Sequence, residues 1–508
     1  WSAAGRTVHW SVGNAHVVYD LAAAQAHADS VEAAERAESD DEEAEADDEG
    51  DDESHGEDED DDAYVPDERR IEVEFDRDVP DGVVALVGGR VVTMRGDEVI
   101  ENGVVIIRDN RIEAVGARGS VQIPNGADEI DVTGKTVLPG YVDTHAHLRA
   151  AYDFHRTQPW AYAANLAFGV TTTRDPQTAT TDVLTYEDQV RAGRMLGPRI
   201  YSTGPGVFSS ENVESLNHAR DVMTRYSSYY DTKTIKMYGA GNRQQRQWII
   251  EAARELELMP TTEGSLDLEL NLTMAQDGYS GTEHNLPGMP LFEDVVRLLA
   301  ESQMATTPTM LVTYGGPWAE NYFYSTEDVF EDEKLRRFTP FEDLQLRTLR
   351  RPGPTGAGNN GWFHESQYPF PLIADFVDRV VEAGGRGGIG SHGQLQGLGY
   401  HWELWAMGMG PDVTPHEALR IATIVGADAL GLDGDLGSIE VGKLADLVIL
   451  NANPLENLRN SREIHRVMMN GRLYDGDTLD EVWPRQRTAG PFYWQKDVIT
   501  PDTRAGTR

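Results

Sequence analysis

The sequence predicts an α/β protein with a (β/α)8 TIM-like barrel inserted in a small split β-sandwich domain, and with a remnant β-propeller strand pair at the N-terminus. Short apolar strands alternate with helical segments over residues 136–439, which is the pattern of a barrel of parallel strands. Further short strands flank this region at 64–135 and 440–480, so we expect the barrel to split the small domain. Residues 1–21 alternate in a strand–turn–strand manner that is typical of a propeller blade.

The two ends of the chain are expected to contribute little to a core. We expect residues 1–37 to be the end of a propeller blade followed by a linker, and residues 481–508 to be a C-terminal tail. Residues 38–63 form a low-complexity acidic run that cannot bury a core and should be disordered, as a solvated spacer rather than a calcium-binding tract. Because the chain begins with Trp1, we expect it to be a fragment of a longer polypeptide or a processed product.

The composition narrows the classes of function. The 508 residues carry a net charge of −42, which argues against nucleic acid because its phosphates would be repelled. Abundant carboxylates with only six lysines against 38 arginines indicate a halophilic, salt-adapted protein. No apolar stretch approaches the roughly 18 residues of a membrane span, and no signal peptide is visible, which says little about secretion in a chain that begins with Trp1. The expected location is extracytoplasmic (periplasmic or secreted) or a high-salt cytoplasm. Without cysteine, a metal must be held by histidine, carboxylate or a modified side chain.

The barrel is expected to contain eight strands joined by helical crossovers. The predicted strands cover 136–147, 169–176, 199–205, 234–239, 259–264, 281–284, 304–311 and 387–392, with helices at 243–258, 291–302 and 371–383. The split domain is expected to take its strands from 83–87, 90–94, 103–108, 111–115, 445–450 and 465–472. The aromatic- and glycine-rich stretch 313–370 is a candidate lid or substrate wall, because long loops after barrel strands cover the active-site face.

Histidines stand at the predicted C-terminal ends of several of these strands. His145 and His147 are two residues apart, so on a strand both rings point the same way and can share one divalent cation such as Zn²⁺. A bare His-x-His is more often a pair of surface residues. Here, however, Lys236, His284 and His392 are expected on the same rim, where barrel enzymes keep their active sites. The sequence therefore predicts a metal centre.

Two motifs carry a resemblance to a known family. The segment 139–147 (Pro-Gly-Tyr-Val-Asp-Thr-His-Ala-His) and the tail formed by 414–423, 437–450 and 453–455 are similar to the signatures of the amidohydrolase superfamily, in its imidazolonepropionase/prolidase-like branch. The similarity spans about residues 80–475. Together with the propeller-like start, the chain resembles the C-terminal part of TolB-propeller–amidohydrolase fusion proteins.

The resemblance implies a role for several residues. His145 and His147 would bind the more buried of one or two divalent metal ions, Zn²⁺ first, with Mn, Fe or Co as alternatives. Lys236 occupies the position of a lysine that is carboxylated and bridges two metals; a lysine paired with a carboxylate is the structural alternative. His284 matches the ligand on the sixth strand. The resemblance thus implies a metal-dependent hydrolase.

Two positions depart from the family pattern. Glu263 stands on the fifth strand where the family has histidine, and could be an oxygen ligand or a proton shuttle. His392 stands on the eighth strand where the family has aspartate, and could bind a metal or act as general base, since an imidazole titrates near neutrality. These departures leave the number of metal ions open.

Other polar residues near the predicted strand ends are candidates for binding substrate. Tyr238 could donate a hydrogen bond to a developing oxyanion, or be a core residue. Arg174 could orient substrate or pair with its neighbour Asp175. His401 and Glu403 follow the eighth strand and could line the pocket or lie in a solvated loop.

The sequence therefore predicts a metal-dependent hydrolase acting on the C–N bond of an amide or cyclic amide. A prolidase-like dipeptidase is the alternative within enzymes, and a catalytically degenerate barrel acting as a binding or assembly module is the alternative from another class. The expected partner is a small-molecule or peptide-like amide substrate; neither nucleic acid nor a membrane span is expected, and homo-oligomerisation stays open.

Overall fold

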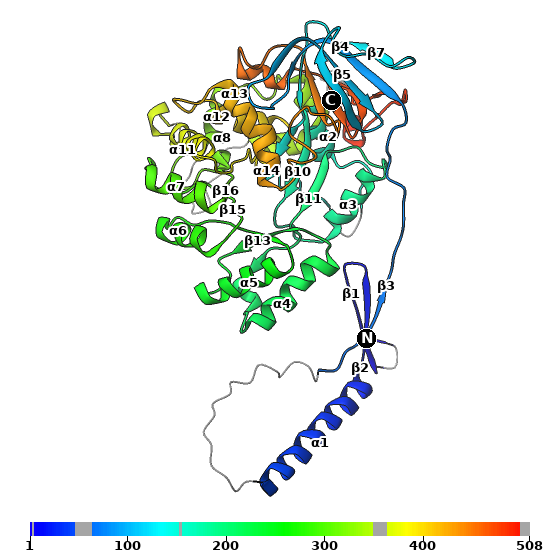
Figure 1. Cartoon of the computed structure of the whole chain (residues 1–508), viewed down its shortest axis with the longest axis vertical. Coiled ribbons are helices and arrows are strands. Elements are labelled where there is room, and N and C mark those ends of the chain that lie inside the picture. Colours follow the sequence, from blue (N-terminus) through cyan, green and yellow to red (C-terminus); the bar gives the residue numbers. More distant parts are fainter. Residues whose placement is uncertain (3–4, 46–62, 152–154, 349–362, 498–508) are drawn as a thin grey trace, which may run out of the picture. The chain divides into compact units, whose positions relative to one another are not determined.

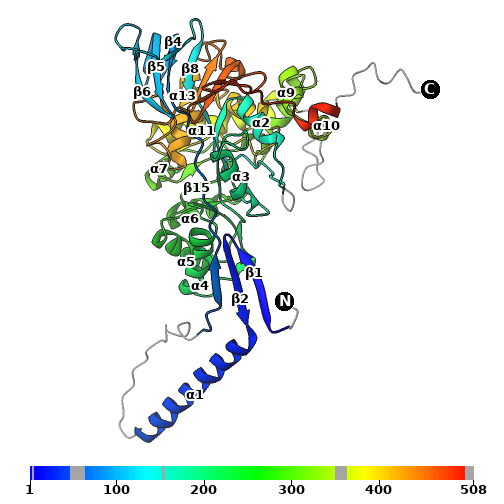
Figure 2. The same cartoon turned by 90° about the vertical axis from the view of Figure 1, so that its right-hand side faces the viewer.

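The computed structural model describes residues 1–2, 5–45, 63–151, 155–348 and 363–497 (Figures 1 and 2). Contacts divide the chain into two compact units, which we treat separately. The first unit comprises residues 1–75 with 227–231, and the second comprises 76–226 with 232–508. Within the described ranges, every helix is too short or too polar to span a bilayer.

The first unit contains a three-stranded antiparallel sheet. Strand β1 (Thr7–Val12) pairs with β2 (Ala15–Asp20), and β2 pairs with β3 (Asp67–Arg70). The predicted N-terminal strand pair is therefore present, while its assignment to a propeller stays a prediction. Helix α1 (Leu21–Glu45) takes the place of the predicted linker and extends into the acidic run, because alanine and glutamate are good helix formers. The remainder of that run, 46–62, lies outside the described residues.

The second unit holds a nine-stranded sheet made from both ends of its sequence. The strands run in the order β20-β19-β18-β17-β8-β4-β5-β6, with β7 also paired to β4. Their bounds are β4 (Val83–Val92), β5 (Val99–Arg108), β6 (Arg111–Ala117), β7 (Asp128–Asp131), β8 (Thr136–Pro139), β17 (Leu447–Leu450), β18 (Ile464–Met469), β19 (Arg472–Asp475) and β20 (Glu481–Trp483). Strands β4 to β8 lie together at one end of the unit, away from α4 to α7 (Figures 1 and 2).

Three predicted boundaries are corrected. The segments 83–87 and 90–94 form one continuous strand, β4. The C-terminal tail begins inside the sheet, because β20 pairs with β19 and Trp483 is buried. The run 136–147 is not one strand: β8 pairs with β4 and β17, and the chain then enters a separate parallel sheet. Gly140 lies at the break, where a side chain would collide with Thr171.

Parallel strands form the second sheet system, and the predicted α/β fold is confirmed. One sheet runs β11-β10-β9 and another runs β12-β13-β14-β15-β16. Two parallel bridges, Asp143 with Ile389 and Thr306 with Gly387, link the two sheets through residues 387–389. The strands are β9 (Tyr141–Asp143), β10 (Val170–Asp175), β11 (Arg199–Ser202), β12 (Val207–Phe208), β13 (Thr234–Tyr238), β14 (Met259–Thr262), β15 (Gly281–Thr282) and β16 (Ala305–Thr306).

Helices separate these strands in the sequence. They are α2 (Trp160–Ala167), α3 (Asp182–Arg191), α4 (Leu216–Thr224), α5 (Arg243–Glu255), α6 (Leu268–Asp277), α7 (Glu293–Ser302), α11 (Phe370–Glu382), α12 (Leu398–Met407), α13 (Pro415–Arg420) and α14 (Gly426–Ala429). The three predicted helices correspond to α5, α7 and α11. The stretch 313–370 contains α8 (Ala319–Thr326), α9 (Glu333–Phe338) and α10 (Phe341–Thr348), while 349–362 lies outside the described residues.

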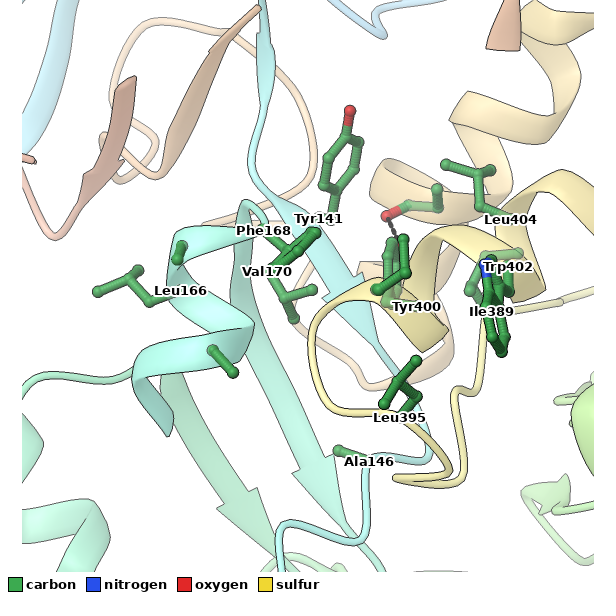
Figure 3. Packing of buried hydrophobic residues seen from close by; sticks show 14 of the residues in the cluster. Tyr141, Ala146, Leu166, Phe168, Val170, Ile389, Leu395, Tyr400, Trp402 and Leu404 are labelled. Atoms are coloured by element: carbon green, nitrogen blue, oxygen red, sulfur yellow. Dashed lines mark hydrogen bonds between the residues drawn. The ribbon is translucent and has the colours of Figure 1, made fainter. Parts of the chain in front are cut away.

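A buried apolar cluster fixes the strand that leads into the predicted metal ligands. Tyr141 of β9 stacks on Tyr400 of α12, with 5.6 Å between the ring centroids, and Phe168 and Val170 lie beside them (Figure 3). The Tyr400 hydroxyl donates to the Val142 carbonyl at 3.2 Å. The start of β9 is therefore held on both sides by close packing, which limits the freedom of the residues that follow it.

Candidate metal centre

The segments of His145 and His392 are tied to each other through one buried carboxylate. Asp143 ends β9 and accepts hydrogen bonds from the His145 amide at 3.0 Å and from the Ser391 hydroxyl at 2.6 Å. The His392 amide in turn donates to the His145 carbonyl at 2.7 Å. Gly390 leaves room for this approach, because a Cβ there would lie 2.8 Å from that of His145. Two segments far apart in the sequence are therefore held in fixed register.

His145, His147 and His392 form a group that we call the three-histidine group. The Nε2 atoms of His145 and His147 lie 3.0 Å apart, and one ring nitrogen of each histidine lies within 4.8 Å of the others. His147 and His392 both adopt positive φ, at 38° and 55°, a conformation that costs energy for a residue with a side chain. Three strand-end imidazoles thus converge on one point, as predicted.

The three rings are neutral around neutral pH. Burial, followed by the positive charge of Lys236, lowers the pKa of His145 and lowers that of His147 to about 3. Burial likewise lowers the pKa of His392. A neutral imidazole keeps a lone pair, which is the form that binds a metal.

His284, Glu263 and Lys236 form the other side of the centre. Glu263 follows β14 and lies 2.6 Å from the Lys236 ammonium and 3.3 Å from Nε2 of His284. Tyr314 donates at 2.8 Å to the Glu263 oxygen that faces His284, and its ring stacks on the His284 ring. Burial alone would raise the pKa of Glu263, but His284 and the charge of Lys236 outweigh it and lower that pKa. Glu263 is therefore an ionised carboxylate facing a buried ammonium.

A second layer of residues orients the imidazoles. Glu283 is fully buried and lies 2.9 Å from Nδ1 of His145, while its other oxygen pairs with the Arg174 guanidinium. Thr309 lies 2.6 Å from Nδ1 of His284 and Gln394 lies 3.3 Å from Nδ1 of His392. Such partners fix the ring orientation and raise the basicity of a metal ligand.

Sequence reasoning missed this second layer. Glu283 could have been found, since an acidic residue directly precedes His284 in a predicted buried strand. Arg174 was expected to orient substrate or to pair with Asp175. Instead it pairs with Glu283 and donates to the Thr144 carbonyl at 3.0 Å.

A cavity of about 590 Å³ opens beside the three-histidine group. It is lined by His147 and His392 and by a polar wall that includes Arg149, Asp175, Gln177 and Thr178. Burial raises the pKa of Asp175 to about 7. The volume falls within the usual range for small-molecule sites.

His401 and Glu403 lie apart from this cavity. Both are buried in α12: His401 contacts the Phe168 carbonyl at 2.8 Å and the Ser461 hydroxyl at 2.9 Å. Glu403 accepts hydrogen bonds from the backbone amides of Met310 and Leu311, at 2.6 and 2.9 Å. Neither residue lines the cavity. The sequence suggested a pocket wall or a solvated loop, but in the structure both residues have a structural role.

Both interpretations of Tyr238, as a hydrogen-bond donor to an oxyanion and as a core residue, stay predictions. Its ring stacks on Phe208 and lies 5.0 Å from the Lys236 ammonium, at the edge of the centre. His155 is exposed and contacts the Tyr186 ring.

The chain is similar to several known proteins. The Amidohydrolase family profile matches residues 376–474. An imidazolonepropionase of Symbiobacterium thermophilum is 26% identical over 412 residues, covering 73% of this chain and 89% of that protein. A guanine deaminase of Escherichia coli is 22% identical, covering 74% of this chain and 91% of that protein.

Solved structures share the fold. A Xaa-Pro dipeptidase with bound methionine superposes with a TM-score of 0.58 at 20% identity, covering 78% of this chain and all of the other. An ochratoxinase of A. niger gives a TM-score of 0.57 at 16% identity, covering 78% and 96%. The chain is therefore similar to amidohydrolase-family enzymes that act on carbon–nitrogen bonds, in the profile match over residues 376–474 and along most of its length, and it shares the fold of the solved structures.

Proposed function

We propose that the chain is a metal-dependent hydrolase of small amides or cyclic amides, with its centre at the C-terminal ends of the strands of a (β/α)8 barrel. The observation that carries this proposal is the three-histidine group, whose ring nitrogens lie within 4.8 Å of one another at the wall of a cavity. The parallel order of β9 to β16 and the bridges through 387–389 support the barrel.

The donor set fits a divalent metal ion. His145, His147 and His392 would hold it, and three neutral imidazoles suit Zn²⁺, with Mn²⁺, Fe²⁺ or Co²⁺ as alternatives. His284 lies beside them, with its Nε2 buried and 3.3 Å from the Glu263 carboxylate. A divalent ion bound there lowers the pKa of a bound water and polarises a carbonyl group.

Lys236 and Glu263 bear on how many ions are bound. The resemblance implied a carboxylated lysine that bridges two metals, but here Glu263 replaces a histidine and faces Lys236 at 2.6 Å. We propose that this ion pair occupies the second metal position and that one ion is bound. A carboxylated Lys236 with two ions is the alternative, and ¹³C NMR after equilibration with labelled bicarbonate separates the two by the presence of a carbamate resonance.

Glu263 is the proposed proton acceptor. It is ionised, partly exposed and held in place by Tyr314 and Lys236, so it can take a proton from the attacking water and return it to the leaving nitrogen. His392, weighed above as a general base, is assigned as a ligand because it completes the three-histidine group. Tyr238 is positioned at the edge of the centre to donate to a developing oxyanion.

The cavity favours a substrate with an anionic group. Arg149 lies in its wall with His147 and His392, so a carboxylate on the substrate would meet a positive charge next to the reacting bond. A cyclic amide is proposed first because relatives of nearly full length are imidazolonepropionases. A prolidase-like dipeptidase remains the alternative, since a dipeptide also presents an amide and a carboxylate.

The test is a substrate screen with matched variants. Zn²⁺- and Mn²⁺-loaded protein is incubated with cyclic amides, N-acyl amino acids, Xaa-Pro dipeptides and amino-heterocycles, each with and without a carboxylate. We expect turnover that is strongest in one carboxylate-bearing class, abolished in His147→Ala and retained in His218→Ala, a half-exposed histidine of α4. Activity that survives His147→Ala would contradict the proposal, and binding without turnover in every class would support the degenerate module instead.

A further inference from the structure

A second group of possible metal ligands lies outside the centre described above. Asp378 and Glu382 stand one turn apart on α11, and Glu417 stands on α13. One carboxylate oxygen of each lies within 4.8 Å of the other two. Asp375 and Asp412 add further negative charge around Asp378. We call Asp378, Glu382 and Glu417 the acidic group.

Asp378 is the unusual member. Only 4% of it is exposed, yet among the residues that the structure describes none gives its carboxylate a hydrogen bond or an ion pair. Burial, and then the charges of Glu417 and Glu382, raise the pKa of Asp378 to about 7. A buried carboxylate facing other carboxylates is costly unless a cation joins them.

Other buried acids of this chain show the contrast. Asp446 faces the Arg199 guanidinium and accepts from the Asn470 amide at 2.7 Å. Glu403 accepts from two backbone amides. Asp378 is as buried as these residues but is surrounded by like charge, so the partner it lacks within the chain is a positive one.

We propose that Asp378, Glu382 and Glu417 bind a Ca²⁺ ion that joins α11 to α13. All three ligands are oxygens, which hard cations prefer. Ca²⁺ takes about six to eight oxygens in flexible geometry, including carboxylates that bind through one or both oxygens, whereas Mg²⁺ demands near-ideal octahedral geometry and keeps several waters. Glu417 also accepts from the Thr414 amide at 2.7 Å, so the capping box of α13 presents its carboxylate in a fixed position.

The experiment measures ⁴⁵Ca²⁺ binding by equilibrium dialysis to the Zn²⁺-loaded full chain in the presence of Mg²⁺. Because carboxylates elsewhere on a chain of net charge −42 can also attract calcium, the comparison of variants identifies the site. We expect Asp378→Asn to weaken Ca²⁺ binding at one class of site by about tenfold or more, and Glu382→Gln to weaken binding at the same site. Glu301→Gln, at an exposed acid on α7, should leave the affinity unchanged.

Thermal unfolding supplies an independent readout. In calcium-free buffer Asp378→Asn should raise the Tm, because it removes an unpaired buried charge, and Ca²⁺ should raise the Tm of the wild type but not of this variant. Equal calcium responses in the wild type and Asp378→Asn would overturn the proposal, as would a wild type without any response. If Asp378→Asn does not fold, an unchanged affinity in Glu382→Gln overturns it, because that residue is exposed and tolerates the change.

Discussion

Two kinds of buried histidine occur in this molecule, and their difference identifies the metal centre. His401 is fully buried and His147 largely so, and burial lowers the pKa of each to about 3. In His401 each ring nitrogen faces a polar partner, the Phe168 carbonyl and the Ser461 hydroxyl. The Nε2 of His147 instead faces that of His145 at 3.0 Å, beside a cavity. The arrangement of partners around the ring, rather than its pKa, therefore distinguishes a ligand from a structural histidine.

The largest effect is expected from removing a member of the three-histidine group. His392→Ala should lower kcat/KM for the substrate found in the screen by at least about 100-fold, because the ion loses one of three nitrogen ligands. The far-UV circular dichroism should be unchanged. A variant with wild-type activity would show that His392 is not a ligand.

The matching change at the structural histidine should act on stability alone. His401→Leu leaves the buried Phe168 carbonyl without its partner and removes one of two partners of the Ser461 hydroxyl, which should lower the free energy of unfolding by about 2 kcal/mol. Urea denaturation measures this loss, and the zinc content of the folded variant should equal that of the wild type. A loss of zinc without a loss of stability would reverse the distinction between the two histidines.

The contributions of the three-histidine group and of His284 to zinc binding can be measured separately. Glu283→Gln keeps an acceptor for His145 but removes the charge, so we expect Zn²⁺ affinity, measured by chelator competition, to fall about tenfold. Thr309→Val removes the partner of His284 and should change the affinity much less if the ion lies in the three-histidine group. Equal losses in both variants would instead make His284 a full ligand.

Much of this arrangement was predictable because strand periodicity is local. His145 and His147 follow an apolar strand, and Lys236, His284 and His392 stand at the ends of others, so their convergence follows from the parallel order of the strands. The role of His401 was not predictable, because its partner Ser461 lies 60 residues away in sequence. The pairing of Arg174 with Glu283 also spans two strands whose relative rotation the sequence does not reveal.

The smallest effect concerns a buried carboxylate with a purely structural role. Burial raises the pKa of Glu403 to about 8, above its ordinary value of 4.5, so between these values the folded protein keeps a proton that the unfolded chain releases. Stability should therefore fall as the pH rises through this range, by up to about 1.4 kcal/mol per pH unit. Urea denaturation at pH 5.5, 6.5 and 7.5 should show a flatter dependence for Glu403→Gln, and parallel curves would contradict this assignment.

The most direct test of the account is the zinc content of the purified chain after loading and removal of free metal. We expect one equivalent of zinc in the wild type and one in His401→Leu. His145→Ala and His392→Ala should retain less than one tenth of that, because the loss of a ligand weakens zinc binding by about tenfold or more. Wild-type protein that retains no zinc, or a full equivalent retained by the His145 and His392 variants, would contradict the assignment of the three-histidine group as the metal site.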